Sequence, residues 1–418
     1  MTLPLTDRRL LIEIAAATLE ALRSSNGFVA FAESSVPSEI PQDQASRDII
    51  ANTLSSALDW ARMEQEVHPS TQETVDGGVQ AEPYIPSNQA LSLIQSAYAE
   101  YIETSAGGVL EIPFDPADPG WLTIAYEKLK ALVRGNHRFI KHSSASSFQY
   151  PLGEDAVVAV VGDWGTGQPT AERVMERIRD CKPTHVIHLG DIYYSGTPHE
   201  VQTRFLDVIA KHGPAQADCR YFSLNGNHDM YSGGYGYFDS LLPKLGQDAS
   251  YFNLRNEYWQ LVGLDSGYED YGLQDPQRDW LVAQLDGKSS KSIVLSHHQL
   301  FSPYESRAAN RTLLKKTAAL LPEVFAWFWG HEHKCIILGE NMGIKPRCIG
   351  HGAIPVTVPY GPAPFPAIPI EKVDERSAPP PDGGGIHGFA LLRFAGPNLR
   401  ISYLDEFGGE FWAESSGF

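Results

Sequence analysis

Hydrophobic and polar positions divide the chain into two parts that differ in periodicity. Up to about residue 147, apolar residues recur every three or four positions, as in amphipathic helices. The pattern predicts helices over residues 6–23, 46–66, 88–104 and 121–133. Asn26-Gly27 and Pro69 lie where two of these helices are expected to end. This part contains no motif with recognisable chemistry, so we interpret residues 1–147 as a helical region that serves packing or contact with another protein.

From residue 148 onward, short apolar runs alternate with helix-like segments, which is typical of an α/β fold. The expected strands cover residues 156–161, 185–189, 221–224, 258–264, 292–295, 325–329, 389–393 and 399–404. Helices are expected at 170–180, 276–285 and 310–320. Thr197-Pro198-His199-Glu200 has the sequence of a capping box at a helix start. The Pro- and Gly-rich residues 354–385 are expected to form a long irregular loop.

Composition narrows the classes of partner. The 418 residues carry a formal net charge of −18, and such an acidic chain repels nucleic-acid backbones and anionic membranes. We therefore expect neither as a partner. Charged residues interrupt the N-terminal apolar stretch, and the sequence has no apolar run of about 18 residues, so we expect a cytoplasmic protein. The four cysteines lack C-x-x-C spacing and are expected to be buried free thiols.

Five expected strands are each followed directly by residues that can bind a metal ion. The five segments are Gly162-Asp163-Trp164-Gly165, Gly190-Asp191-Ile192-Tyr193-Tyr194, Asn225-Gly226-Asn227-His228-Asp229, Ser296-His297-His298 and Gly330-His331-Glu332-His333. Each alone is commonly a turn or part of a core. Ligand sites in α/β folds gather at the carboxyl ends of strands, so these five loops are expected to converge.

The residue types in these loops suit a pair of metal ions. Carboxylate, amide and imidazole groups together favour Fe, Mn or Zn over Ca or Mg. A carboxylate can bridge two ions about 3.5–4 Å apart, the separation used in two-metal hydrolysis. In an extended segment, Gly-His-x-His would direct both imidazoles to one side, so that one could serve each ion. The sequence therefore predicts a two-metal centre between Asp163 and His333.

The ordered set GDWG, GDIYY, GNHD, SHH and GHEH resembles the calcineurin-like metallophosphoesterase superfamily over roughly residues 153–405. The resemblance implies a four-layer α/β/β/α sandwich at residues 148–418, the catalytic domain, preceded by the helical region. Within the superfamily, the motifs are most similar to purple acid phosphatases of the tartrate-resistant type. Position 165 is Gly rather than His, Tyr194 stands three residues after Asp191, and a Gly-rich loop follows GNHD.

This resemblance implies the ligands of each ion. One ion would be held by Asp163, Asp191, Tyr194 and His333. The other would be held by Asp191, Asn227, His297 and His331, with Asp191 as the bridge. Tyr193 is the alternative phenol, disfavoured by spacing only. The expected metals are Fe paired with Fe, Mn or Zn.

The resemblance also implies a mechanism in which a metal-activated water attacks phosphorus in line. His228 would protonate the leaving alcohol, and Asp229 would orient His228. His298 is either a substrate contact or a core neighbour. His351 either faces the pocket or is a structural histidine.

The implied function is hydrolysis of a small phosphate monoester. The alternative is a phosphodiesterase that acts on cyclic nucleotides or other diesters with the same centre. A third hypothesis is a metal-binding regulatory protein without turnover. The ligand set does not separate monoester from diester. That choice depends on the loops at 232–238, 265–275, 299–309 and 354–387.

Overall fold

The computed structural model describes residues 8–23, 44–67, 84–105, 119–287, 290–305, 311–365, 368–380 and 383–416. The chain forms two compact units. The first comprises Met1–Asn136 with Tyr231–Gly233, and the second comprises His137–Met230 and Gly234–Phe418.

The first unit is helical, as expected. Its helices are α1 (Arg8–Arg23), α3 (Gln44–Val67), α4 (Gln89–Ser105), α5 (Pro119–Leu129) and α6 (Ala131–Arg134). The last expected helix is divided in two at Lys130. Residues spaced three and four apart on α1, such as Leu11, Ile14 and Ala15, are buried in the shared core. The expected helix ends at Asn26-Gly27 and Pro69 lie outside the described residues.

The second unit contains two sheets. The eight-stranded sheet has the order β1-β5-β6-β7-β8-β10-β9-β11, and the six-stranded sheet has the order β14-β13-β12-β2-β3-β4. The first consists of β1 (Gln149–Pro151), β5 (Phe252–Arg255), β6 (Trp259–Gly263), β7 (Lys291–Ser296), β8 (Ala326–Trp329), β9 (Cys335–Leu338), β10 (Lys345–Ile349) and β11 (Ile370–Val373). The second consists of β2 (Val157–Val161), β3 (His185–His188), β4 (Arg220–Ser223), β12 (Gly388–Ala395), β13 (Asn398–Asp405) and β14 (Glu410–Ser416).

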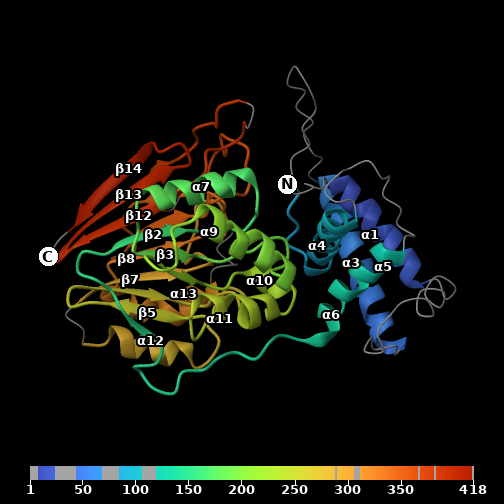
Figure 1. The fold of residues 1–418 in the computed structure, drawn as a ribbon, viewed down its shortest axis with the longest axis horizontal. Helices are drawn as coiled ribbons and strands as arrows, with labels where there is room; N and C mark the ends of the chain where they lie inside the picture. The colour runs from blue at the N-terminus through green and yellow to red at the C-terminus, as the bar shows by residue number, and fades with distance from the viewer. Residues whose placement is uncertain are drawn as a thin grey trace. The chain divides into compact units, whose positions relative to one another are not determined.

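Helices cover the outer faces of these sheets (Figure 1). Those of six or more residues are α7 (Pro169–Asp180), η1 (Val201–Leu206), α9 (Asp207–His212), η2 (Gly236–Leu241), α12 (Gln277–Leu285), α13 (Arg311–Thr317) and η3 (Ala318–Glu323). Shorter helices are α8 (Pro198–Glu200), α10 (Asn227–Tyr231) and α11 (Leu242–Leu245). The predicted capping box is present, because Glu200 N–H donates to the Thr197 hydroxyl and the Glu200 carboxylate accepts from Thr197 N–H.

The two faces of strand β2 pack into different cores, which shows how the four layers are stacked. Its alternate residues Val158 and Val160 belong to the core between the two sheets. Ala159 and Val161 belong to a second core, formed with α7 and α9. A third core lies between the eight-stranded sheet and α12 and α13. A strand covered on both faces reads as a continuous apolar run, and the expected α/β/β/α sandwich is confirmed.

The sequence pattern missed β1, β5, β9, β10, β11 and β14, and three of these, β1, β11 and β14, lie at sheet edges. β11 lies at the edge of the eight-stranded sheet, and none of its residues is fully buried. β14 lies at an edge of the other sheet and is likewise mostly half-buried. An edge strand with one partner has little apolar surface to bury, so it shows no clear hydrophobic pattern. The expected irregular loop at 354–385 therefore contains β11.

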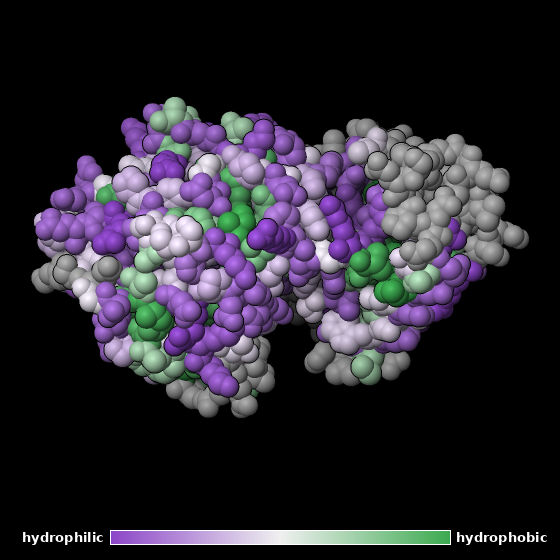
Figure 2. Space-filling view, turned by 90° about the horizontal axis from the view of Figure 1, so that it is seen from below, coloured by the Kyte–Doolittle hydropathy of each residue, from purple (hydrophilic) through white to green (hydrophobic). Residues whose placement is uncertain are grey.

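Hydrophilic residues predominate on the face shown in Figure 2, where hydrophobic residues occur in small separate patches. None of the described helices is both long enough and apolar enough to cross a membrane. The four cysteines are free thiols, as expected, although Cys181 is only partly buried.

The placement of the inter-sheet core can be tested at Leu392 of β12, which is fully buried there. Leu392→Ala is expected to lower the free energy of unfolding by about 2–5 kcal/mol, because it leaves a cavity between the sheets. Its exposed neighbour provides the control, since Arg393→Ala should change that free energy by no more than about 0.5 kcal/mol. Urea unfolding followed by tryptophan fluorescence measures both. Equal losses in the two variants would contradict this placement.

Candidate metal centre

The five metal-competent loops converge where strands of both sheets end. Asp163, Asp191 and Asn227 follow β2, β3 and β4 of the six-stranded sheet. His297 follows β7 of the eight-stranded sheet, and His331 and His333 follow β8. The predicted convergence is therefore present.

One group of donor atoms surrounds His297. Its Nε2 lies 3.0 Å from Asn227 Oδ1 and 3.2 Å from His331 Nδ1. Asn227 Oδ1 and His331 Nδ1 are 3.1 Å apart, and His297 Nε2 is 3.3 Å from Asp191 Oδ2. With metal–ligand bonds of about 2.1 Å, neighbouring ligands lie about 3.0 Å apart in an octahedron and about 3.4 Å apart in a tetrahedron. These four separations match those between neighbouring ligands of one ion.

A second group surrounds the hydroxyl of Tyr193. This oxygen lies 2.8 Å from Asp163 Oδ1, 3.0 Å from His333 Nε2 and 3.3 Å from Asp191 Oδ2. His333 Nε2 is 3.5 Å from Asp163 Oδ1. The same oxygen of Asp191 therefore belongs to both groups.

The tyrosine in this group is not the one that the motif spacing favoured. Tyr194 donates its backbone N–H to the Glu200 carboxylate, and its ring lies 5.3 Å from the Arg204 guanidinium carbon. Asp191 has a left-handed backbone with φ of 74°, so counting residues from it does not predict side-chain direction. The geometry therefore favours Tyr193 over Tyr194 as the candidate phenol.

Backbone conformation is unusual at this centre. Asp163, Asp191, His331 and His333 have φ of 56°, 74°, 63° and 51°. Non-glycine residues seldom adopt this region, at a cost on the order of 1–3 kcal/mol each, and such strain concentrates at functional sites. The expectation that Gly-His-x-His would be extended is therefore wrong. The two imidazoles reach different donor groups because the backbone is left-handed at both histidines.

Glycine provides the space for two of the carboxylates. A Cβ atom added at Gly226 would lie 2.0 Å from Asp191 Oδ1. A Cβ atom added at Gly330 would lie 2.6 Å from Asp163 Oδ2. Only glycine allows the backbone to approach the carboxylates so closely.

Burial and neighbouring charges set the protonation of Asp191, His297 and His331. Burial opposes ionisation of Asp191, but His297 and His228 outweigh it and hold the pKa of Asp191 well below its usual range. Burial also opposes charge on His297, yet Asp191 raises its pKa to about 9. Asp191 and His297 thus hold a proton that a metal ion bound to both would displace. Burial, then His298 and His297, lowers the pKa of His331 well below 6.5, which keeps its imidazole neutral as a ligand must be.

The donor types fit a metal ion as well as their spacing does. Asp163, Asp191 and His297 each offer a ligand atom within 4.8 Å of the others, and so do His297, His298 and His331. His297 Nδ1 lies 3.0 Å from the Leu189 carbonyl, which accepts its N–H and leaves Nε2 for a metal. Metal-binding histidines usually have such a second partner.

Asp229 contacts backbone groups of the loops around the centre. Its carboxylate accepts N–H groups from Asp191 at 3.0 Å, Ile192 at 3.1 Å and Gly226 at 2.8 Å. A partner of His228 is the Tyr194 carbonyl, 2.6 Å from His228 Nδ1. The contacts of Asp229 therefore fix the loop that presents Asp191.

Two further histidines are packed against neighbouring groups. His298 is fully buried, with Nδ1 3.2 Å from the Ser266 hydroxyl and Nε2 3.1 Å from the Asp270 carboxylate. These contacts favour the core-neighbour alternative over a substrate contact. His351 is also buried, and its carbonyl accepts the Gly388 N–H, which favours the structural alternative.

Sequence reasoning missed Tyr271, whose hydroxyl lies 2.6 Å from His331 Nε2. No motif marks this residue, because it lies in a loop between β6 and α12.

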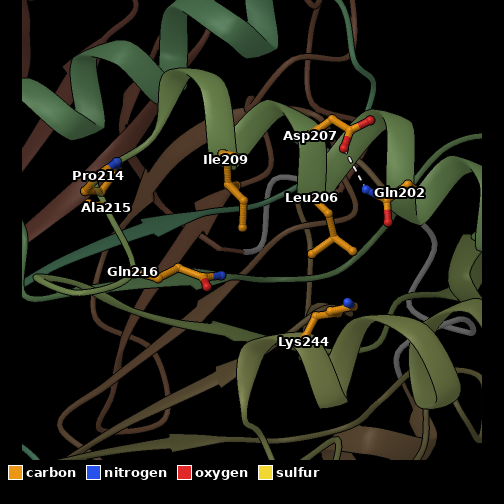
Figure 3. Close-up of a pocket in the computed structure, with 9 residues that line it drawn as sticks. Gln202, Leu206, Asp207, Ile209, Pro214, Ala215, Gln216 and Lys244 are labelled. Carbon is orange, nitrogen blue, oxygen red and sulfur yellow. Dashed lines mark hydrogen bonds between the residues drawn. The ribbon is translucent and has the colours of Figure 1, made fainter.

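A separate pocket lies among η1, α9, the loop after α9 and α11 (Figure 3). It is lined by Gln202, Leu206, Asp207, Ile209, Ala210, Pro214, Ala215, Gln216 and Lys244, and shares no residue with the metal centre.

Part of the chain that contains the candidate ligands matches a known protein family. Residues 156–335, which include every candidate ligand, match the family model of the calcineurin-like phosphoesterases. No curated protein sequence matches the chain. Solved structures with a similar fold include GAP50, the anchor in the inner membrane complex of Plasmodium. It is 13% identical, with 63% of this chain and 89% of that chain covered and a TM-score of 0.44.

Two more similar structures are PhoD and Yfce, a phosphoesterase from E. coli. PhoD is 9% identical, with 63% of this chain and 68% of that chain covered and a TM-score of 0.41. Yfce is 14% identical, with 62% of this chain and 98% of that chain covered and a TM-score of 0.28. The family match thus indicates a calcineurin-like phosphoesterase domain at residues 156–335.

Proposed function

We propose that this domain hydrolyses small phosphate monoesters with two metal ions. One ion would be held by Asp163, Asp191, Tyr193 and His333, and the other by Asp191, Asn227, His297 and His331. The observation that carries the proposal is that Asp191 Oδ2 lies within 3.3 Å of donors in both groups, Tyr193 Oη and His297 Nε2. A carboxylate shared in this way is how two-metal hydrolases hold their ions close together.

The donors favour Fe paired with Fe, Mn or Zn. Imidazole nitrogen suits these metals, whereas Mg and Ca prefer sites made of oxygen alone. Such ions would bind phosphate oxygens and lower the pKa of a water molecule toward neutrality. In a chain with a net charge of −18, they would also supply the positive charge that an anionic substrate needs.

His228 is the proposed proton donor to the leaving oxygen. Its backbone N–H donates to Asp191 Oδ1 at 2.9 Å, which ties the residue to the proposed bridge. Its Nδ1–H donates to the Tyr194 carbonyl, which fixes the ring orientation, and Nε2 is the nitrogen that would transfer a proton. A group held in this way acts without losing further side-chain freedom.

Iron-loaded protein tests the choice of phenol. A ferric phenolate has a visible charge-transfer band, so the wild-type protein loaded with iron is expected to be coloured. Tyr193→Phe should abolish the band, because it removes the oxygen 2.8 Å from Asp163 Oδ1. Tyr194→Phe is the matched control and should keep it. Absorption spectra at equal iron content measure the difference.

The opposite pattern, with colour lost only in Tyr194→Phe, would restore the assignment that motif spacing favoured. A colourless and fully active di-manganese or di-zinc protein would show that the centre does not use a ferric phenolate.

Substrate choice is tested with two synthetic esters. The motif resemblance to purple acid phosphatases predicts a higher kcat/KM for p-nitrophenyl phosphate than for bis-p-nitrophenyl phosphate. Asn227→Ala should reduce both rates, because Asn227 Oδ1 lies in the donor group around His297. A strong preference for the diester would favour the phosphodiesterase alternative. Metal-loaded protein that turns over neither ester would favour the regulatory alternative.

A further inference from the structure

The loop that follows β6 contacts two histidines beside the centre. The Tyr271 hydroxyl lies 2.6 Å from His331 Nε2, and the Asp270 carboxylate lies 3.1 Å from His298 Nε2. The Tyr271 ring also packs on His298, with ring centroids 4.0 Å apart. The His298 ring in turn lies 4.7 Å from the His331 ring. This loop thus contacts the side of His331 that faces away from the donor atoms.

The position of the proton on His331 follows from its two sides. Nδ1 faces Asn227 Oδ1 at 3.1 Å and His297 Nε2 at 3.2 Å, the atoms proposed to share a metal ion. A lone pair on Nδ1 is needed there, so the proton of the neutral ring must be on Nε2. That N–H points to the Tyr271 hydroxyl oxygen as its acceptor. Glu305 Oε1, 4.0 Å from Nε2, also favours an N–H at this position.

Tyr271 is held firmly in place. Its φ is 55°, a left-handed conformation that is uncommon for a bulky residue. Lys316 Nζ donates at 2.8 Å to both oxygens of Glu269, which precedes Tyr271, and to the carbonyl of Leu273, which follows it. Earlier in the loop, the Tyr268 hydroxyl donates to the His137 carbonyl at 2.7 Å. A strained residue kept in place by such contacts indicates a functional constraint.

We propose that Tyr271 is a positioning residue for the metal centre. By accepting the Nε2–H of His331, its hydroxyl fixes the tautomer and the ring orientation that present Nδ1 to the ion shared with Asn227 and His297. The inference rests on the two-metal function proposed above. It adds a residue outside all five motifs to the machinery that holds one particular ion.

Tyr271→Phe tests this role because it removes only the hydroxyl and keeps the ring on His298. Removing such an outer hydrogen-bond partner typically weakens metal affinity about 10–100-fold. In a calorimetric titration of metal-free protein with Mn²⁺, one binding step should weaken by that factor. The other step, for the ion held by Asp163 and Tyr193, should be unchanged. Tyr268→Phe is the matched control, since Tyr268 lies in the same loop but its hydroxyl bonds to the distant His137 carbonyl.

Wild-type affinity for both ions in Tyr271→Phe would overturn the inference while leaving the proposed function intact. Equal weakening in Tyr271→Phe and Tyr268→Phe would also overturn it, because the loop rather than the hydroxyl would then matter. If the wild-type protein binds no Mn²⁺, Fe or Zn, the inference and the proposed function both fail. Thermal unfolding of each metal-free variant confirms that the compared proteins are folded.

Discussion

The arrangement of donor atoms at the candidate metal centre depends on the Asp191 carboxylate, which lies between the two donor groups. Its Oδ2 faces both groups, and its Oδ1 accepts the backbone N–H of His228. Its own N–H donates to Asp229, and the glycine at position 226 leaves room for it. Two cations close together repel each other, so the proposed pair of ions would need an anionic bridge at this point. The Asp191 carboxylate is placed there by its contact with Asp229, by the space at Gly226 and by its own left-handed backbone.

The two sheets contribute different chemistry to the centre. The carboxylates, the amide and the phenol come from loops of the six-stranded sheet, whereas His297, His331 and His333 come from the eight-stranded sheet. Neither sheet alone supplies a complete donor group, so the apolar core between them sets the distances at the centre. A bound ion would also join the sheets, because it binds the packed arrangement and not the unfolded chain.

Some buried strands were predictable because apolar runs lead directly into the metal-competent loops. β2 and β8 are apolar along their length, and β3 has Val186 and Ile187 between two histidines, so these strands and the convergence of their loops followed from the sequence. β5, β9 and β10 are also largely buried, but the sequence pattern did not single them out. Edge strands such as β11 left no such pattern. The choice between Tyr193 and Tyr194 was also hidden, since it depends on a left-handed backbone at Asp191. Tyr271 was hidden because its contact with His331 joins residues 60 positions apart.

The central claim is a pair of ions bridged by Asp191, and electron paramagnetic resonance of Mn²⁺-loaded protein tests it most directly. The account predicts two Mn²⁺ per chain with a spin-coupled signal, and Asp191→Ala should lose that coupling. A single Mn²⁺ per chain, or two ions that give only the signal of isolated Mn²⁺, would contradict the account.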